Sequence, residues 1–378
     1  MVPFQHTPSG PAIGGPGIAS SVGEKTLLKK HELVLVVTDA TVRAAGLVDG
    51  VLASLGERAV IVDDGCLPDG DTEHTEALAA QARDAGVTAI CAVGGGSVMD
   101  TAKGVGAVMA TGASLRALEG IAKVKARTAP LVCIPTTAGT GSEATQFCVI
   151  KDHSAHEKRI LVDTNLIPAL AVLDPLLLVG LPPAVTAATA VDGLTHAVEA
   201  LVSRLGNPIG TALARQAIAL IAADDGLAQT LRDPTDVDAR GRSLVGAHLA
   251  GQAVNTSMLG ACHALAHVVG ARFGVPHGVA NGLFLVDVMK TNTTRASAAY
   301  AALGPIMGVA ADVDAVIAAI DRLVHDVASI PRRLRDVAPI TVDDLPALAA
   351  AAAKDPDLPT NPVRLDEKAL LSILVGRW

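Results

Sequence analysis

Five short apolar runs, each bounded by Gly, Asp or Pro, recur along the first half of the chain. Stretches with helical spacing separate them, such as EHTEALAAQARDAG, which ends in a glycine. Continuous apolar runs of this length are typical of strands buried on both faces, as in a parallel sheet covered by helices. The sequence therefore predicts an open, parallel α/β layer structure. The predicted strands are 33–38, 59–64, 87–93, 131–135 and 169–174.

The pattern changes at a Pro-Pro pair that ends at Pro183. From there almost to the C-terminus the chain is rich in alanine and other helix formers, with hardly any strand signal. We therefore expect two domains, an α/β domain over 1–182 and an all-helical domain over 183–378. This division agrees with the chain length, since domains average ~150 residues.

Composition narrows the classes of function. The formal net charge of -8 comes without the clustered Lys and Arg of a nucleic-acid groove, so small metabolites are the expected partners. Five cysteines without CxxC spacing predict reduced thiols in a cytoplasmic protein. The N-terminus lacks the basic and apolar segments of a signal peptide. The large apolar fraction favours a homodimer or larger homo-oligomer.

Residues 244–271 contain no Asp, Glu, Lys or Arg, and the stretch is long enough to span a bilayer. It also holds Gln, Asn, Thr, Ser and three histidines, which are costly in lipid. We therefore expect a buried segment of a soluble core and no membrane span.

A strand, a three-glycine turn and a helix follow one another in VTAICAVGGGSVMDTAKGVG. Glycines let a backbone approach a phosphate closely, and a helix N-terminus offers unpaired N–H groups. The turn is not GxGxxG and does not follow the first strand, so an ordinary Rossmann fingerprint is absent. We favour a phosphate site over a plain tight turn, and we assign Asp100 on the helix to cofactor binding.

A second polar loop, IPTTAGTGSEATQ, follows the next predicted strand and contains Thr136, Thr137, Thr140 and Ser142. Two such loops at strand ends indicate a ligand outside the carboxyl edge of the sheet. The alternative is a loop whose hydroxyls cap a helix.

Asp39 closes the predicted strand LVLVVTD. A carboxylate at this position accepts hydrogen bonds from an adenosine ribose and repels a 2'-phosphate, which favours NAD over NADP. Arg43, one helical turn later, suits a phosphate and leaves NADP open. The competing interpretation of Asp39 is a helix N-cap.

Two histidines lie four residues apart in GACHALAHVVGARFGVPHG, His263 and His267, and His277 follows after Gly and Pro have ended the helix. Asp192 and His196 show the same spacing in VDGLTHAVEA. One carboxylate with three imidazoles suits Fe²⁺ or Zn²⁺. Such an ion also explains a carboxylate in an apolar helix, where an unpaired charge is costly.

The alternative for each histidine is a hydrogen-bonded core residue. Two pairs of residues at a spacing of four, together with a PHG turn, argue against this alternative. Glu199 shares the helical face of Asp192, and we favour a supporting or surface role for it over metal ligation. Position 264 is alanine, so the glutamate base of an HExxH zinc protease is missing.

Together these stretches resemble the iron-containing, group III metal-dependent alcohol dehydrogenase family. The motifs GGGSVMDTAK, IPTTAGTGSEAT, AVDGLTHAVEALVS, ACHALAH, GVPHGVANGLFL and LPTNPVRLD match it in order and spacing. The resemblance implies the dehydroquinate synthase-like fold, with a Rossmann-like N-terminal domain, an all-helical C-terminal domain and an active site in the cleft between them. The implied activity is NAD(P)-dependent, metal-dependent oxidation of a small alcohol or reduction of an aldehyde by hydride transfer, with Fe²⁺ as the expected ion.

The resemblance also implies roles for individual residues. The implied metal ligands are Asp192, His196, His263 and His277. His267 matches a nearby histidine that faces substrate and nicotinamide and acts in catalysis. The implied cofactor contacts are Asp39, Gly95, Gly96, Ser97, Thr136, Thr137, Thr140 and Lys158.

The chain departs from the family pattern at two places. Asp69 and Gly70 replace its usual Asn-Pro pair near the adenosine side, and Val286 and Asp287 replace a common Pro-His pair. Maleylacetate reductase, glycerol dehydrogenase and dehydroquinate synthase-like activities stay open within the fold. A metal-dependent hydrolase and a non-catalytic metal- or nucleotide-binding protein are the alternatives from other classes.

Overall fold

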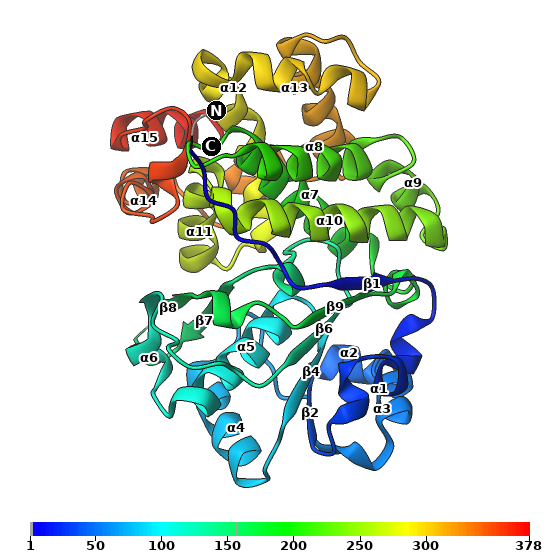
Figure 1. The fold of residues 1–378 in the computed structure, drawn as a ribbon. Coiled ribbons are helices and arrows are strands. Elements are labelled where there is room, and N and C mark those ends of the chain that lie inside the picture. Colours follow the sequence, from blue (N-terminus) through cyan, green and yellow to red (C-terminus); the bar gives the residue numbers. More distant parts are fainter. Residues whose placement is uncertain (1–2, 156) are drawn as a thin grey trace. The chain divides into compact units, whose positions relative to one another are not determined.

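The computed structural model describes residues 3–155 and 157–378, which form two compact units (Figure 1). The α/β unit consists of Thr7–Thr137 and Gly141–Val179. The helical unit consists of residues 3–6, Ala138–Thr140 and Gly180–Trp378. Two short pieces from the N-terminal half of the chain thus belong to the helical unit.

Within the described residues, the α/β unit contains a six-stranded sheet in the order β1-β9-β6-β4-β2-β3. Every neighbouring pair is parallel, which confirms the predicted parallel sheet and all five predicted strands. The sequence did not indicate β1, because its three residues form no apolar run. The strands are β1 (Ala12–Gly14), β2 (Val34–Val37), β3 (Ala59–Asp63), β4 (Ala89–Gly94), β6 (Leu131–Pro135) and β9 (Leu170–Leu173).

Side chains alternate between the two faces of the sheet and enter two separate apolar clusters. Leu35 joins one cluster, with side chains from α4 (Thr72–Asp84) and α5 (Gly96–Thr111). Its neighbour Val36 joins the other, with side chains from α3 (Asp49–Leu55). Burial on both faces explains why the strands read as continuous apolar runs. The remaining helices of this unit are α1 (Val22–Lys25), α2 (Ala40–Ala44) and α6 (Leu115–Leu118).

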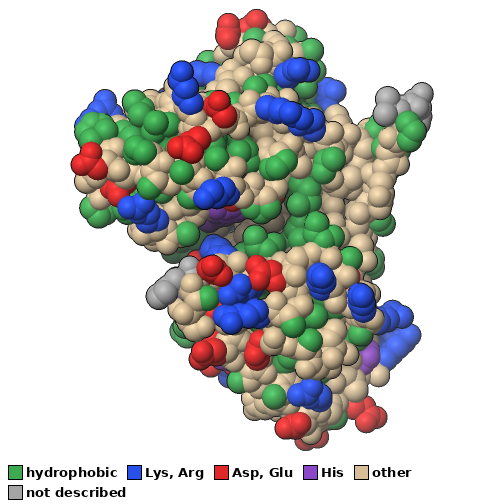
Figure 2. All heavy atoms as spheres, turned by 90° about the vertical axis from the view of Figure 1, so that its left-hand side faces the viewer, with side chains coloured by type: hydrophobic (Ala, Val, Ile, Leu, Met, Phe, Trp, Pro, Cys, Tyr) green, Lys and Arg blue, Asp and Glu red, His purple; other side chains and the backbone are tan. Residues whose placement is uncertain are grey.

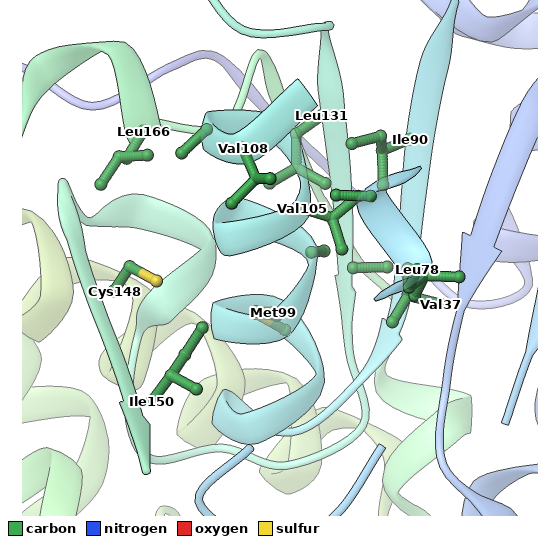
Figure 3. Close-up of a cluster of buried hydrophobic side chains, with 14 of the residues drawn as sticks. Val37, Leu78, Ile90, Met99, Val105, Val108, Leu131, Cys148, Ile150 and Leu166 are labelled. Carbon is green, nitrogen blue, oxygen red and sulfur yellow. The ribbon is translucent and has the colours of Figure 1, made fainter. Parts of the chain in front are cut away.

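A smaller sheet, β5-β8-β7, packs beside α5. Its strands β7 and β8 form an antiparallel hairpin that the sequence analysis did not anticipate. Figure 3 shows α5 between Cys148 and Ile150 of this hairpin and the main sheet with Ile90. The second sheet thus covers the outer side of α5. Its strands are β5 (Gly120–Ile121), β7 (Phe147–Asp152) and β8 (Glu157–Val162).

Residues 183–378 contain helices and turns and no strand, as the sequence predicted. Pro183 occupies the first position of α7, where its missing N–H costs no hydrogen bond. α7 packs against α8, α10 and α12. The helices are α7 (Pro183–Val202), α8 (Pro208–Ala222), α9 (Leu227–Arg232), α10 (Val237–Ser257), α11 (Ala261–Phe273), α12 (His277–Ala301), α13 (Val313–Asp321), α14 (Leu345–Ala352) and α15 (Glu367–Gly376).

One glycine sets the distance between α7 and α12. A Cβ atom at Gly278 would lie 1.9 Å from the carbonyl oxygen of Ala188. That oxygen belongs to the backbone of α7 and has no side-chain freedom with which to move aside. Only glycine therefore allows α12 to begin this close to α7.

The surface is mixed in charge, and the cysteine thiols are buried. On the face shown in Figure 2, Lys and Arg side chains are interspersed with Asp and Glu. Among the described residues, no helix combines the length and apolarity needed to cross a membrane. All five cysteines are free and buried. Burial raises the pKa of the Cys66 thiol to about 11 and that of Cys91 to about 12.

Candidate functional site

The structure brings the four predicted metal-binding side chains together from α7, α11 and α12. Oδ1 of Asp192 lies 3.4 Å from Nε2 of His277 and 3.8 Å from Nε2 of His263. Nδ1 of His196 lies 3.8 Å from Oδ2 of Asp192, and the ring centroids of His196 and His263 are 4.6 Å apart. Side chains from distant parts of the helical unit thus converge on one point.

Local sequence explains how each side chain reaches this point. Asp192 and His196 lie one turn apart on α7 and therefore share a face. α11 ends at Phe273, where Gly274 adopts a left-handed conformation with φ of 68°. Three residues after this glycine α12 begins at His277, so this side chain projects from the start of a new helix.

The side-chain amide of Asn281 lies among three of the four predicted metal ligands. Its Nδ2 lies 2.8 Å from Oδ1 of Asp192. The same nitrogen lies 3.2 Å from Nε2 of His263 and 3.3 Å from Nε2 of His277. An amide nitrogen has two hydrogens and cannot donate to all three atoms at once. Three potential ligand atoms thus face one point, as the ligands of a cation do.

An unsatisfied atom supports the same interpretation. Nδ1 of His196 is buried and has no hydrogen-bond partner within the described part of the chain. Burying a polar atom in this way costs free energy unless a ligand engages it. Together with the carboxylate and the other two imidazoles, it gives the nitrogen and oxygen donors that Fe²⁺ and Zn²⁺ accept. The residues present therefore fit a divalent ion.

The protonation states differ sharply among these residues. Burial alone would raise the pKa of Asp192, but the imidazoles of His196, His277 and His263 hold it well below its usual range. Burial lowers the pKa of His196, and desolvation together with the neighbouring imidazoles lowers that of His277, which favours the neutral rings that bind metals. Burial also opposes the charge of His263, but Glu199 and Asp192 raise its pKa to about 10. Use of His263 as a ligand is therefore coupled to loss of a proton.

Glu199 lies behind His263. Its Oε2 is 2.6 Å from Nδ1 of His263 and accepts a hydrogen bond from the backbone N–H of Gly260. Its Oε1 accepts one from the backbone N–H of Cys262. These contacts orient the His263 ring so that Nε2 faces Asp192.

His267 lies beside the group and has a different partner. Its ring is stacked on that of His277, with centroids 5.5 Å apart and planes at 12°. Its Nδ1 lies 2.9 Å from Oδ2 of Asp355. The His267 side chain is 27% exposed, whereas that of His263 is fully buried. His267 is thus the more accessible of the two imidazoles on α11.

Two residues of this region were missed in the sequence. Asn281 follows His277 by four residues, so the helical spacing that paired the histidines also places it on their face. Asp355 lies 88 positions from His267, and no local pattern connects the two.

The predicted phosphate loops adjoin one another in the α/β unit. β4 and β6 are paired up to Gly94 and Pro135, so their carboxyl ends lie side by side. Oγ1 of Thr137 lies 3.4 Å from the position that a Cβ on Gly95 would occupy. Gly95 is the N-cap of α5 and provides no side-chain cap for its N–H groups. An uncapped helix N-terminus in a glycine turn fits the diphosphate of a dinucleotide.

Ser97 and Lys158 are linked through Asp69. The backbone N–H of Asp69 donates to Oγ of Ser97, at 3.0 Å. Oδ1 of Asp69 lies 3.1 Å from Nζ of Lys158 on β8. Asp69 holds a left-handed backbone conformation, with φ of 63°, which is uncommon for a residue other than glycine. The residue that departs from the family pattern therefore connects two predicted cofactor contacts.

The carboxylate of Asp100 is hydrogen-bonded to other parts of the α/β unit. One carboxylate oxygen accepts a hydrogen bond from Oγ of Ser142 and the other from the backbone N–H of Val149. Lys103, one turn later, donates to the same Ser142 hydroxyl. Burial raises the pKa of Asp100 against the opposing charge of Lys103. Both carboxylate oxygens are engaged within the protein, where they hold a loop and the hairpin onto α5.

The other predicted cofactor residues occupy separate places. Thr136 is buried, and its backbone N–H donates to the carbonyl oxygen of Gly94. Thr140 belongs to the helical unit, with Ala138–Thr140. Asp39 is the N-cap of α2, and its Oδ1 accepts both side-chain cap hydrogen bonds, from the backbone N–H groups of Thr41 and Val42. The cap interpretation of Asp39 is therefore confirmed, and Oδ2 forms no further cap bond.

Known proteins match this chain over nearly its whole length. Residues 11–175 match the family model of iron-containing alcohol dehydrogenase, and residues 186–378 match that of the Fe-containing alcohol dehydrogenase family, C-terminal. A 1,3-propanediol dehydrogenase from Klebsiella pneumoniae is 37% identical over 371 residues, which cover 95% of each chain.

Solved structures give the same result. A 1,3-propanediol oxidoreductase superposes with a TM-score of 0.93 at 35% identity over 100% of both chains. A sulfoacetaldehyde reductase from Bifidobacterium kashiwanohense, solved in complex with NAD⁺, superposes with a TM-score of 0.92 at 25% identity, over 100% of this chain and 99% of the other. The chain therefore belongs to the iron-containing alcohol dehydrogenase family.

Proposed function

We propose that the protein is an NAD-dependent, divalent-metal-dependent alcohol dehydrogenase that interconverts a small alcohol and its aldehyde by hydride transfer. The convergence of Asp192, His196, His263 and His277 around the Asn281 amide carries this proposal. The activities for which its relatives are named, which include 1,3-propanediol dehydrogenase and sulfoacetaldehyde reductase, support a short polar substrate.

The four converging residues would hold the ion, with Fe²⁺ proposed and Zn²⁺ as the alternative. Such an ion, when bound, supplies a Lewis acid for the substrate oxygen. The chain itself contributes the charge of Asp192 and the fixed orientation of His263 through Glu199. His267 is proposed to move the substrate proton at Nε2, because its Nδ1 is occupied by Asp355.

The α/β unit would hold the cofactor, which supplies or accepts the hydride. The uncapped start of α5 at Gly95 and Gly96 is the proposed diphosphate site, with Thr137 beside it. Asp39 is the proposed ribose contact and the basis of a preference for NAD over NADP. The other proposed contacts are Ser97, Asp100, Thr136, Thr140 and Lys158, with Asp100 acting from behind the loop.

We also predict the oligomeric state, the location, the partners and the roles of the two domains. The predictions are a homodimer or larger homo-oligomer, a cytoplasmic location, no nucleic-acid partner, and a division of labour between a dinucleotide-binding domain over 1–182 and a metal-binding catalytic domain over 183–378. Sedimentation of the purified protein tests the first of these.

The decisive experiment starts with anaerobic purification, metal quantification and a panel of short aldehydes and diols. Absorbance at about 340 nm follows the reduced nicotinamide, with NADH and NADPH in parallel. We expect metal-dependent oxidation of NADH by at least one aldehyde. Bound metal with turnover of an ester or phosphate in the absence of NAD would instead establish a hydrolase, and turnover of maleylacetate or glycerol alone would move the protein to another branch of the fold.

His277→Ala tests the ligand assignment. The His277 side chain is 37% exposed at the start of α12, so its removal should leave the fold intact. We expect loss of bound metal and of activity with an unchanged circular dichroism spectrum. A metal-replete, active variant would remove His277 from the ligand set.

A further inference from the structure

His267 and Asp355 form a pair with a defined hydrogen position. Nδ1 of His267 lies 2.9 Å from Oδ2 of Asp355. An ionised carboxylate only accepts hydrogen bonds, so in a neutral His267 the ring hydrogen must be on Nδ1. The lone pair is then on Nε2.

Asp355 is itself held in place. Its Oδ1 accepts a hydrogen bond from the backbone N–H of Asp357, at 2.9 Å, and its side chain is 9% exposed. Burial alone would raise the pKa of Asp355, but the hydrogen bond to His267 lowers it below its usual range. The carboxylate is therefore ionised at neutral pH and has one oxygen free of the backbone to orient His267.

Asp357 is close to the pair but does not join it. Its Oδ2 lies 4.0 Å from Nδ1 of His267, beyond hydrogen-bond distance. Burial raises the pKa of Asp357 to about 6. The two carboxylates thus differ in geometry while sharing one loop, so Asp357 provides a matched control.

The stacking on His277 fixes the plane of the His267 ring, and Asp355 fixes its rotation. The hydrogen bond between His267 and Asp355 uses Nδ1 and leaves Nε2 on the opposite side of the ring. The side chain retains an exposed fraction of 27%, so the ring is not sealed into the core. This atom is available to a molecule from outside the protein.

We propose that Asp355 is a positioning residue that holds His267 in the Nδ1–H tautomer and so makes Nε2 the proton acceptor in alcohol oxidation. The inference rests on the proposed function. Oxidation of the alcohol removes two electrons with one hydrogen as a hydride to NAD⁺ and releases one proton. Nε2 of His267 accepts that proton and passes it to water, and aldehyde reduction follows the reverse path.

Three variants test the proposal: Asp355→Asn, Asp355→Ala and Asp357→Asn. An Asn amide at position 355 donates to Nδ1 and thereby favours the opposite tautomer. We expect Asp355→Asn to lower kcat on the order of 10²-fold, with KM for NADH and bound metal unchanged. Asp355→Ala removes the orientation without imposing the wrong tautomer and should lose less. Asp357→Asn removes the same charge from the same loop and should change kcat by less than about threefold, as expected of a group without a hydrogen bond to the ring.

The ¹⁵N spectrum of histidine-labelled, zinc-loaded protein reads the tautomer directly, and His267→Gln identifies the resonance. We expect the wild-type proton on Nδ1 and the Asp355→Asn proton on Nε2. A wild-type proton on Nε2, or an Asp355→Asn variant with wild-type kcat, would overturn the inference. Wild-type protein that turns over no alcohol or aldehyde would overturn the proposed function instead, and the tautomer measurement would still decide whether Asp355 controls the ring.

Discussion

Nδ1 of His263 and Oε2 of Glu199 lie 2.6 Å apart, in a place where neither side chain reaches solvent to an appreciable extent. The same carboxylate accepts two backbone N–H groups at the start of α11. Glu199 therefore supports both the orientation of one imidazole and the beginning of the helix that carries it.

Glu199→Gln should weaken metal binding by about 10- to 100-fold, as loss of an orienting partner does at other metal sites. It should also lower the free energy of unfolding by about 1–3 kcal/mol, because an amide offers one acceptor oxygen where a carboxylate offers two. Competition with a zinc chelator and urea unfolding measure the two effects. Glu367→Gln, at an exposed position on α15, is the control and should change neither. Unaltered zinc affinity in Glu199→Gln would argue against an orienting role.

Gly278→Ala should destabilise the helical unit by about 1–3 kcal/mol, because the added methyl group meets the backbone of α7. Separation of α7 from α12 should also weaken metal binding, since Asp192 and His277 lie on these two helices. Thermal unfolding and metal content test both expectations. Gly376→Ala, with open space around the new methyl group, should be neutral or slightly stabilising. Equal behaviour of the two variants would show that the close approach is unimportant.

Asp39→Asn should relax the selection against NADPH without loss of stability. Asn keeps the cap of α2, whereas the negative charge that repels a 2'-phosphate is lost. A repulsion of ~1–4 kcal/mol between charges at ~4 Å predicts a rise on the order of tenfold or more in relative kcat/KM for NADPH. Asp39→Gly should behave similarly, since glycine is tolerated at an N-cap. If cofactor selectivity stays the same in both variants, Asp39 only caps the helix.

Asp152→Asn should destabilise the protein more at neutral pH than in acid. Hydrogen bonds from Ser154 and Arg159 hold the pKa of Asp152 well below its usual range. A carboxylate with a lowered folded-state pKa stabilises the fold above its unfolded value of ~3.9, and this contribution is lost as the pH falls toward the folded value. Urea unfolding at neutral pH, near pH 4 and near pH 3 should show the variant approach the wild type on acidification. A constant difference across this range would contradict the assignment.

The strands that could be predicted were those buried on both faces, because burial leaves a continuous apolar run such as LVCIP in the sequence. The β7–β8 hairpin lacks that signature. Its residues alternate between buried and partly exposed, and the strand ends next to the turn are rich in charge, with Lys151, Asp152, Lys158 and Arg159. Such a strand is stabilised by its neighbours α5 and β5, which the local sequence does not reveal.

Some residues of the candidate site could likewise be predicted from local sequence, and others could not. The helical spacing that pairs Asp192 with His196 is local, so it could be recognised in the sequence. Their grouping with the later histidines was inferred from residue types, the choice of three ligand imidazoles came from the family resemblance, and the contact with His263 depends on the packing of α7 and α11. Asp355 could not be found, because its partner His267 is far away in the chain and both residue types are common on protein surfaces. Asp100 was assigned to the cofactor from its place on α5, yet its contacts turn inward to Ser142 and Val149.

The buried thiols give the chain its own conformational probes. Four of them, Cys66, Cys91, Cys133 and Cys148, lie in the α/β unit, and Cys262 lies alone in the helical unit, one residue before His263. A thiol that is buried and has a raised pKa reacts with alkylating reagents only when the surrounding structure opens. Labelling at Cys262 thus reports opening around the proposed metal ligands, while labelling at the other four reports opening of the α/β unit. The two units of the protein can therefore be followed separately without introducing a new cysteine.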